Sequence, residues 1–241
     1  MALPKLTQPE FEITLPVIKR KIKFRPFLVK EEKLLLIGKE GDVKDQMNAM
    51  KQVLKAVVLS PKNFDPNDLT VTDIEYLFMH LRGKSVDNII KLRYKDNEDE
   101  QVYDFEVDIN EVEPEFTENR SYDIPVGNLV LELRDPTLKI MIDSGISMEQ
   151  VAISDQDESV KTDSIFNMLA RCLVKVYDNE QVYDDFTHQE ALDFLKGIDI
   201  NSFAQIQKFF ETGPKLKHKI EYKNNLGNER EIVLSGLSDF F

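Results

Sequence analysis

The chain has 241 residues and a net charge of −13 at pH 7, with a single cysteine and no tryptophan. This length allows one large domain or two to three small modules. The acidic balance argues against duplex nucleic acid as the main partner, because phosphate binding needs a cationic surface. No segment approaches the roughly 18 consecutive apolar residues of a transmembrane helix, so no membrane partner is expected. Because Cys172 is the only cysteine, no disulfide can form within the chain, and this cysteine usage favours a reducing compartment.

Residues 1–88 are predicted to form a β-hairpin followed by helices. Apolar and polar side chains alternate over residues 11–15 and again over 21–25, which is typical of two neighbouring strands. Helical character then extends over residues 30–37. Gly38 is expected to end this first helix, because glycine is unfavourable inside helices.

Two stronger helices follow in the same region. The first spans residues 42–59 and has one apolar stripe. Before the second, Thr70 has the position of an N-cap, with Asp73 three residues later as in a variant of the capping box. The second helix is predicted over residues 71–82, and Gly83 is expected to close it.

Residues 89–145 are predicted to form a β-rich acidic module. Hydrophobicity changes there to a period of two in four segments, which cover residues 89–94, 102–109, 122–126 and 129–134. An acidic link over residues 96–100 joins the first two segments, as expected for a hairpin.

Residues 146–241 are predicted to form a C-terminal helical region that ends in a β-hairpin. A polar acidic link over 150–160 leads into the most apolar helix, predicted from residue 159 to 177. Thr187 and Glu190 have the spacing of a capping box and open a further helix. The remaining elements are a helix and the two strands of a hairpin, over residues 202–211, 216–223 and 230–234. The predicted fold class is therefore α+β.

Two parts of the chain have a similar order of elements. Residues 70–109 run from a capped helix through a glycine stop to a hairpin, and residues 187–236 run from a capped helix through a second helix to a hairpin. Sequence identity between the two parts is slight, so the similarity is one of architecture alone.

The sequence contains no recognisable catalytic constellation. Glycine-rich phosphate loops and a nucleophile elbow are absent. One cysteine and the scattered His80, His188 and His218 cannot supply a zinc site. The acidic residues 155–158 lack the spacing of a calcium loop. We therefore predict no catalytic residue, no cofactor and no metal ligand; the alternative of an acidic metal-dependent enzyme rests only on the abundance of carboxylates.

Charge is unevenly distributed along the chain. Residues 1–39 carry nine basic and four acidic side chains, a balance of +5, whereas residues 95–160 carry four basic and nineteen acidic ones, a balance of −15. The alternatives are two solvated faces, steering of a basic partner, or contact between the two ends of the chain.

Aromatic residues at the C-terminus add a second candidate contact. Phe240 and Phe241 are expected either to fold back into the core or to dock into another protein. The predicted partner-binding set combines them with the basic N-terminal segment and consists of Lys21, Lys23, Arg25, Phe27, Phe240 and Phe241. The chain is accordingly interpreted as an interaction protein and not as an enzyme.

Three sequence blocks resemble one family of phage proteins. Residues 23–33, preceded by 11–16, are similar to the N-terminus of the T-even-type myovirus baseplate protein family, which contains a baseplate hub subunit and a related hub assembly catalyst. Residues 73–78 with 81–86 look like the second recurring block of that family, and residues 236–241 are similar to its C-terminal end.

The resemblance implies a role in contractile-tail assembly. The implied function is that of a non-catalytic hub assembly protein, which binds hub or tape-measure components in the host cytoplasm. The alternative is a permanent structural subunit of the virion baseplate hub. In either case the expected partners are other phage tail proteins, with self-association as a further option, and neither nucleic acid nor a membrane is expected as a partner.

Overall fold

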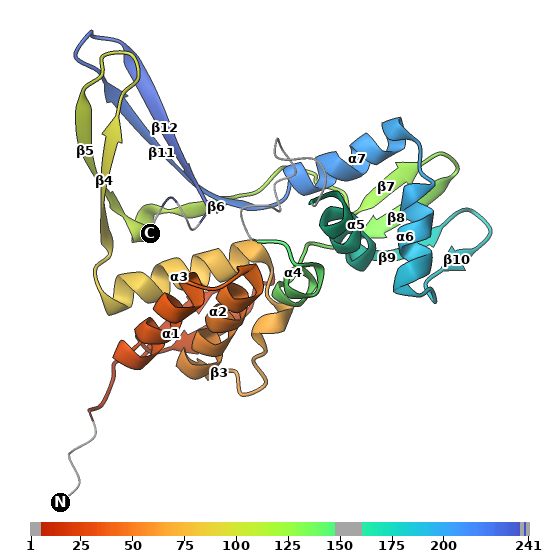
Figure 1. Ribbon diagram of the computed structural model, residues 1–241, viewed down its shortest axis with the longest axis horizontal. Coiled ribbons are helices and arrows are strands. Elements are labelled where there is room, and N and C mark those ends of the chain that lie inside the picture. The colour runs from red at the N-terminus through yellow and green to blue at the C-terminus, as the bar shows by residue number, and fades with distance from the viewer. Residues whose placement is uncertain (1–5, 148–160, 237–238, 240–241) are drawn as a thin grey trace, which may run out of the picture.

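The computed structural model describes residues 6–147, 161–236 and 239. These residues form an N-terminal lobe, a C-terminal lobe and a long arm that projects away from both (Figure 1). The sheets are small and antiparallel and are combined with helices, so the predicted α+β class is confirmed. Within the described part of the chain, no helix has both the length and the apolar character that spanning a bilayer requires.

The N-terminal lobe joins a three-stranded sheet to four helices. The sheet has the order β1-β2-β3, with bounds Phe11–Thr14, Lys21–Phe24 and Val58–Ser60. The helices are α1 Val29–Lys39, α2 Val43–Val57, α3 Val71–Ser85 and α4 Leu138–Ser144. Phe24, Leu54 and Leu77 are fully buried in the core between them. The hairpin and the first three helices are present, but α2 ends at Val57, and residues 58–59, predicted as helix, belong to β3, which pairs with β2. The sequence pattern gave no sign of α4.

The cap predicted at Thr70 is present and also holds the first hairpin. The Thr70 hydroxyl accepts a hydrogen bond from the Asp73 N–H at 3.3 Å. The buried Asp73 carboxylate accepts the backbone N–H groups of Val17 and Ile18, at 2.8 and 3.3 Å, from the turn between β1 and β2. One acidic side chain therefore fixes both the start of α3 and the turn of the hairpin.

Two glycines that were predicted to end helices lie inside them instead. A Cβ atom added at Gly38 would lie 2.5 Å from the Ala49 Cβ, so glycine lets α1 approach α2 closely. Gly83 lies within α3, whose last turn is held by Ser85. The Ser85 hydroxyl donates to the Leu81 carbonyl at 2.6 Å and accepts the Phe27 N–H at 3.0 Å. Tertiary contacts thus outweigh the low helix propensity of glycine at both positions.

The C-terminal lobe packs three helices against a four-stranded sheet. The sheet has the order β10-β9-β8-β7, with bounds Val182–Tyr183, Leu173–Tyr177, Leu129–Leu133 and Asp123–Val126. The helices are α5 Lys161–Cys172, α6 His188–Lys196 and α7 Ile200–Glu211. The capping box of Thr187 and Glu190 is confirmed at the start of α6. Leu131, Met168 and Ile206 are fully buried in the core.

The predicted long helix over residues 159–177 is wrong at its C-terminal end. The helix stops at Cys172, and Leu173–Tyr177 forms strand β9, which pairs with β8. Val174 and Val176 suit a strand, because β-branched side chains lose rotamer freedom in a helix. The acidic link predicted over 150–160 lies outside the described residues.

Residues 89–145 contribute strands to three different sheets. Strand β6 (Glu113–Glu115) pairs with a strand near the C-terminus, and β7 and β8 belong to the sheet of the C-terminal lobe. The predicted boundaries at residues 88 and 145 therefore divide the chain by sequence alone. Strand pairing crosses the boundary at residue 145, because β8 pairs with β9.

The arm consists of the two predicted hairpins and the short strand β6. One hairpin is formed by β4 and β5, with bounds Ile89–Lys95 and Val102–Asp108, and the other by β11 and β12, with bounds Lys215–Lys223 and Glu229–Ser235. These hairpins end the two similar runs of elements in the sequence, and in space they lie side by side (Figure 1).

Candidate functional site

The arm is seated on α3 by a small hydrophobic core. Met79 of α3 is fully buried together with Ile109, Val112 and Leu216 from the base of the arm. Because α3 also presents Leu77 to the core of the N-terminal lobe, this one helix connects the lobe with the arm.

Aromatic rings fill the space between the two hairpins farther out along the arm. The ring of Tyr222 on β11 lies 5.0 Å from that of Tyr103, 5.2 Å from Phe105 and 6.3 Å from Tyr94, measured between centroids. Tilted and edge-to-face contacts at these distances are favourable. Tyr222 is therefore the central residue of the packing between the hairpins.

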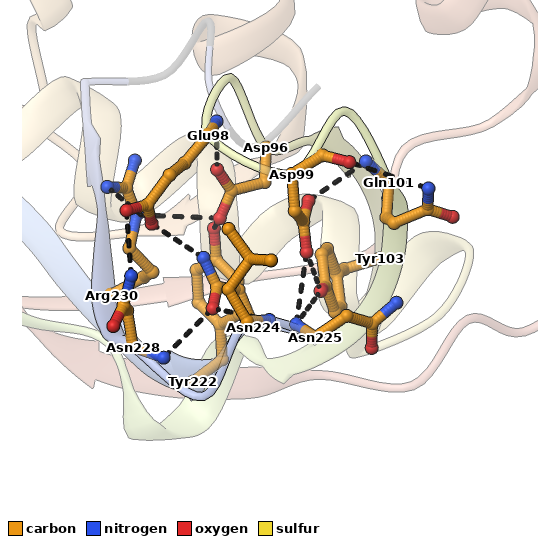
Figure 2. Close-up of polar contacts among 11 residues, drawn as sticks. Asp96, Glu98, Asp99, Gln101, Tyr103, Tyr222, Asn224, Asn225, Asn228 and Arg230 are labelled. Carbon is orange, nitrogen blue, oxygen red and sulfur yellow. Dashed lines mark hydrogen bonds and ion pairs between the residues drawn. The ribbon is translucent and has the colours of Figure 1, made fainter.

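The arm tip, defined as residues 96–101 and 224–230, is closed by a polar network (Figure 2). The Tyr222 hydroxyl donates a hydrogen bond to the fully buried Asp96 carboxylate at 2.6 Å. The Arg230 guanidinium lies 3.4 Å from the same carboxylate. These contacts join residues that are 126 or more positions apart in the sequence.

Glu98 and Asp99 extend this network across the second turn. The Glu98 carboxylate accepts hydrogen bonds from the side-chain amides of Asn224 and Asn228, each at 2.7 Å. The Asn225 backbone N–H donates to the Asp99 carboxylate at 3.0 Å and to the Tyr103 hydroxyl at 2.8 Å. The turn of one hairpin is thus bound to the turn of the other along its length (Figure 2).

Leu226 is the apolar residue at the apex of this network. Its backbone N–H donates to the Asn224 side-chain carbonyl at 3.1 Å, which fixes the loop, while its side chain is 63% exposed. The tip therefore presents one exposed aliphatic side chain on an ordered, mainly acidic support.

The network shifts the pKa values of its members in opposite directions. Loss of solvation, followed by the hydrogen bond to Asp96, raises the pKa of Tyr222 to about 12. The hydrogen bond from Tyr222, followed by that from the Glu98 N–H, holds the pKa of Asp96 below its usual range. The Asp96 contribution to stability is present at neutral pH and is lost as the pH falls through its folded pKa. The Tyr222 contribution is present below about pH 10 and is lost as the pH rises through about 12.

The substitution Tyr222→Phe is expected to loosen the arm tip without unfolding the lobes. It keeps the ring but removes the donor that satisfies the buried Asp96 carboxylate. Hydrogen exchange should become faster at the Glu98 and Asn225 amides and stay unchanged in α6. Tyr183→Phe is the matched control, because Tyr183 is an exposed residue of β10. Equal protection at the tip in wild type and Tyr222→Phe would contradict the role given to this hydrogen bond.

The outer faces of the arm carry charged pairs across the strands. On the β4–β5 hairpin, Arg93 lies 2.9 Å from Asp104, and Lys91 lies 3.6 Å from Glu106. All four side chains are well exposed, so these pairs add little stability. Charged edges of this kind oppose unwanted strand pairing between molecules.

The predicted basic residues of the first hairpin divide into two groups. Lys21 and Lys23 point outward on β2, but each forms an ion pair within its own hairpin, with Glu12 at 3.1 Å and with Glu10. Arg25 is largely buried and binds Glu31 at 3.0 Å. Phe27 is half-buried against the core of the N-terminal lobe.

Arg25 thus acts within the fold. Its guanidinium also donates to the backbone carbonyls of Pro26 and Ala56, at 2.9 and 3.0 Å. The structure does not bring Lys21, Lys23, Arg25 and Phe27 together with the arm tip. Phe240 and Phe241 lie outside the described residues, and a role of the six residues in partner binding stays a prediction.

Cys172 is buried in the core of the C-terminal lobe. Burial raises the pKa of the Cys172 thiol far above its usual range, which disfavours the reactive thiolate. Among the described residues, no three histidine, cysteine, aspartate or glutamate side chains are grouped so that they could hold a metal ion. The acidic residues 155–158 are not among those described.

His80 is expected to make stability depend on pH between about 6.5 and 4. Burial, followed by repulsion from Lys84, lowers its pKa from 6.5 to about 4. Its contribution is therefore present above pH 6.5 and is lost as the pH falls toward 4. We expect a loss on the order of 2 kcal/mol over this interval. The variant His80→Phe, measured by urea unfolding, should have a flatter pH profile; an unchanged slope would show that other groups cause the dependence.

The arm tip was not predicted from the sequence. The turns over 96–100 and 224–228 were each recognised from their polar residues, but no local pattern indicated that they bind each other. The one available signal was the similar order of elements that places a hairpin at the end of each run.

Comparison with known proteins shows a match at the level of the family. The family described as T4 bacteriophage base plate protein matches residues 8–241. No curated protein and no solved structure is significantly similar to the chain. The family match covers the N-terminal lobe, the C-terminal lobe and the arm, and it agrees with the three sequence blocks. The chain therefore belongs to the T4 bacteriophage base plate protein family.

Proposed function

We propose that this chain is a non-catalytic assembly protein of the phage baseplate. It binds hub or tape-measure components during contractile-tail morphogenesis in the host cytoplasm, and the arm tip is its main recognition element. The supporting observation is the closed network that joins Asp96 and Glu98 to Tyr222 and Asn224. A tip held in this way loses little conformational entropy on binding, so more of the contact energy appears as affinity.

The surface of the tip indicates what kind of partner it fits. Leu226 provides an exposed apolar side chain, and the carboxylates of Glu98 and Asp99 surround its loop. An apolar pocket with a basic rim on a hub or tape-measure protein complements this arrangement.

Quantitative mass spectrometry of infected cells and purified virions tests the role in assembly. We expect the chain to co-purify with tail intermediates and to be absent, or far below stoichiometric amounts, in mature virions. Stoichiometric presence in virions would contradict the transient role and would support a permanent structural subunit of the baseplate hub.

Conservative changes on the arm test whether the protein is non-catalytic. Asp104→Asn and Glu106→Gln remove exposed carboxylates of β5 and leave the tip network intact. We expect normal phage yield from both variants. A strong loss of yield with the fold preserved would instead favour the acidic-enzyme alternative.

A further inference from the structure

Strand β11 is paired along only part of one of its two sides. On one side β12 pairs with it from Lys217 to Lys223, but on the other side the short strand β6 pairs only with residues 215–217. In the part of the chain that the structure describes, no further strand joins the ladder on that side. Residues 219–223, here called the open edge, therefore continue a sheet edge whose base at the foot of the arm is already occupied by β6 (Figure 1).

The backbone groups of the open edge point away from β12. At the end of the hairpin, the Gly236 N–H donates to the Leu216 carbonyl at 3.1 Å, so Leu216 faces the β12 side. Because backbone groups alternate in direction along a strand, the even-numbered residues of β11 face β12 and the odd-numbered residues face away. The N–H and C=O groups of Lys219, Glu221 and Lys223 therefore point toward the open side.

Strand β6 agrees with this alternation and shows which residues the edge accepts. Pro114, which has no N–H to donate, lies opposite Leu216, whose own backbone groups face β12. Leu216 is fully buried, and the Glu115 carboxylate lies 3.3 Å from the Lys217 ammonium. The base of the edge thus takes a strand in which an apolar residue lies between acidic ones.

The same alternation of side chains continues along the open edge. Lys219, Glu221 and Lys223 are exposed, whereas Ile220 and Tyr222 between them are half-buried toward the β4–β5 hairpin. An added strand would place its charged side chains beside the three exposed residues and its apolar side chains beside the two half-buried ones.

We infer that the open edge of β11 binds an extended segment of another protein by strand addition. The segment runs antiparallel to β11, and opposite residues 223 to 219 it has the order acidic, apolar, basic, apolar, acidic. Its backbone satisfies the outward N–H and C=O groups of Lys219, Glu221 and Lys223. Lys219 also lies 3.4 Å from Glu231 on β12, but this pair is well exposed and can be shared at little cost.

A second copy of the chain fits the open edge poorly. Antiparallel pairing of two open edges over their full length would place Lys219 against Lys223 and Glu221 against Glu221, and like charges directly opposite each other are destabilising. A shift that brings Lys219 opposite Glu221 would place Lys223 of the second copy opposite Lys217, where Glu113 already pairs. The opposite shift leaves only the residues from Glu221 to Lys223 in contact.

This site goes beyond the proposed function of the arm tip. The tip presents the side chain of Leu226, whereas the open edge presents backbone groups of β11. Leu226→Asp, which changes the tip, should leave binding to the open edge unchanged. Failure of one proposal therefore leaves the other intact.

Synthetic peptides with the core Glu-Val-Lys-Val-Glu test the open edge on the full-length chain by NMR titration. One peptide is unmodified, a second has N-methyl groups on both valines, and a third has them on the lysine and one glutamate. The first two keep every N–H that faces β11, so both should bind and shift the amide signals of Lys219, Glu221 and Lys223. The third should bind about tenfold more weakly or worse. Equal affinity of the second and third peptides would overturn the proposal.

Glu221→Pro and Glu231→Pro make the same change on the two sides of the hairpin. The two glutamates are exposed cross-strand partners, but the Glu221 N–H points to the open edge and the Glu231 N–H to the outer side of β12. Glu221→Pro should reduce the affinity of the unmodified peptide by about tenfold or more, whereas Glu231→Pro should leave it nearly unchanged. Equal effects of the two variants would contradict strand addition at β11.

Sedimentation of the wild-type chain completes the test. We expect no oligomer that depends on the open edge. An oligomer that Glu221→Pro abolishes and Glu231→Pro preserves would show that a second copy occupies the edge, and would overturn the proposed partner.

Discussion

Arg120→Ala is expected to lower the free energy of unfolding by about 3–5 kcal/mol, since it leaves a buried charge without its partner. The Arg120 guanidinium binds the Asp135 carboxylate at 2.7 Å, and both side chains are about nine-tenths buried. It also donates to the Phe209 carbonyl at 3.2 Å and lies 3.9 Å from the centre of the Phe209 ring. The Tyr122 hydroxyl donates to the second oxygen of Asp135.

Arg120 lies where the chain passes between the arm and the C-terminal lobe. Close by, the Thr117 hydroxyl donates to the Thr212 carbonyl at 2.9 Å, which joins the outgoing and returning segments. We therefore expect Arg120→Ala to loosen this junction as well as to destabilise the lobe.

Chemical denaturation measures the effect, with Arg134→Ala as the matched control. Arg134 is exposed, and its guanidinium donates to the backbone carbonyl of Arg171, so loss of the side chain should cost about 1 kcal/mol or less. The double variant Arg120→Ala with Asp135→Ala should be less destabilised than the sum of the single variants. Equal stability of Arg120→Ala and Arg134→Ala would contradict the buried ion pair.

Met79→Ala is expected to cost about 2–5 kcal/mol, because it leaves a cavity between α3 and the base of the arm. Met79 is fully buried and packs with Leu216 and Ile109. Hydrogen exchange should rise in both hairpins of the arm and change little in α2.

Met141→Ala is the control for this experiment. Met141 is also fully buried, but it lies in α4 and packs in the core of the N-terminal lobe. Its truncation should raise exchange in the lobe and leave β5 and β12 protected. If the two variants give the same exchange pattern, the arm and the lobe unfold as one unit and α3 does not separate their cores.

Elements with a local sequence signal were predicted well. The capped helices that begin after Thr70 and Thr187 and the three hairpins follow from side-chain periodicity and capping chemistry, which act over a few residues. The end of α5 was missed because Leu173–Tyr177 is apolar enough for either state, and only pairing with β8 makes it a strand.

The candidate site could not be predicted because its contacts are distant in the sequence. Asp96 and Tyr222 are 126 residues apart. In the sequence, Asp96 fits a polar turn and Tyr222 fits an amphipathic strand, so neither residue indicates a distant partner. Arg25 was interpreted as a surface charge, whereas Glu31 and two backbone carbonyls hold it inside the lobe. The resemblance to a baseplate family was therefore recognised from sequence blocks, whereas the arm tip was recognised only in the folded structure.

The most direct test of recognition by the arm tip is the phage yield of infected cells in which a plasmid supplies the only copy of this protein. Leu226→Asp changes the exposed apex and keeps the backbone N–H that binds Asn224. Val182→Asp makes the same change at a residue that is 55% exposed on β10, away from the arm. If the tip binds the tail protein, yield should fall by about tenfold or more for Leu226→Asp and stay normal for Val182→Asp. Normal yield from a folded Leu226→Asp protein would contradict recognition through the arm tip.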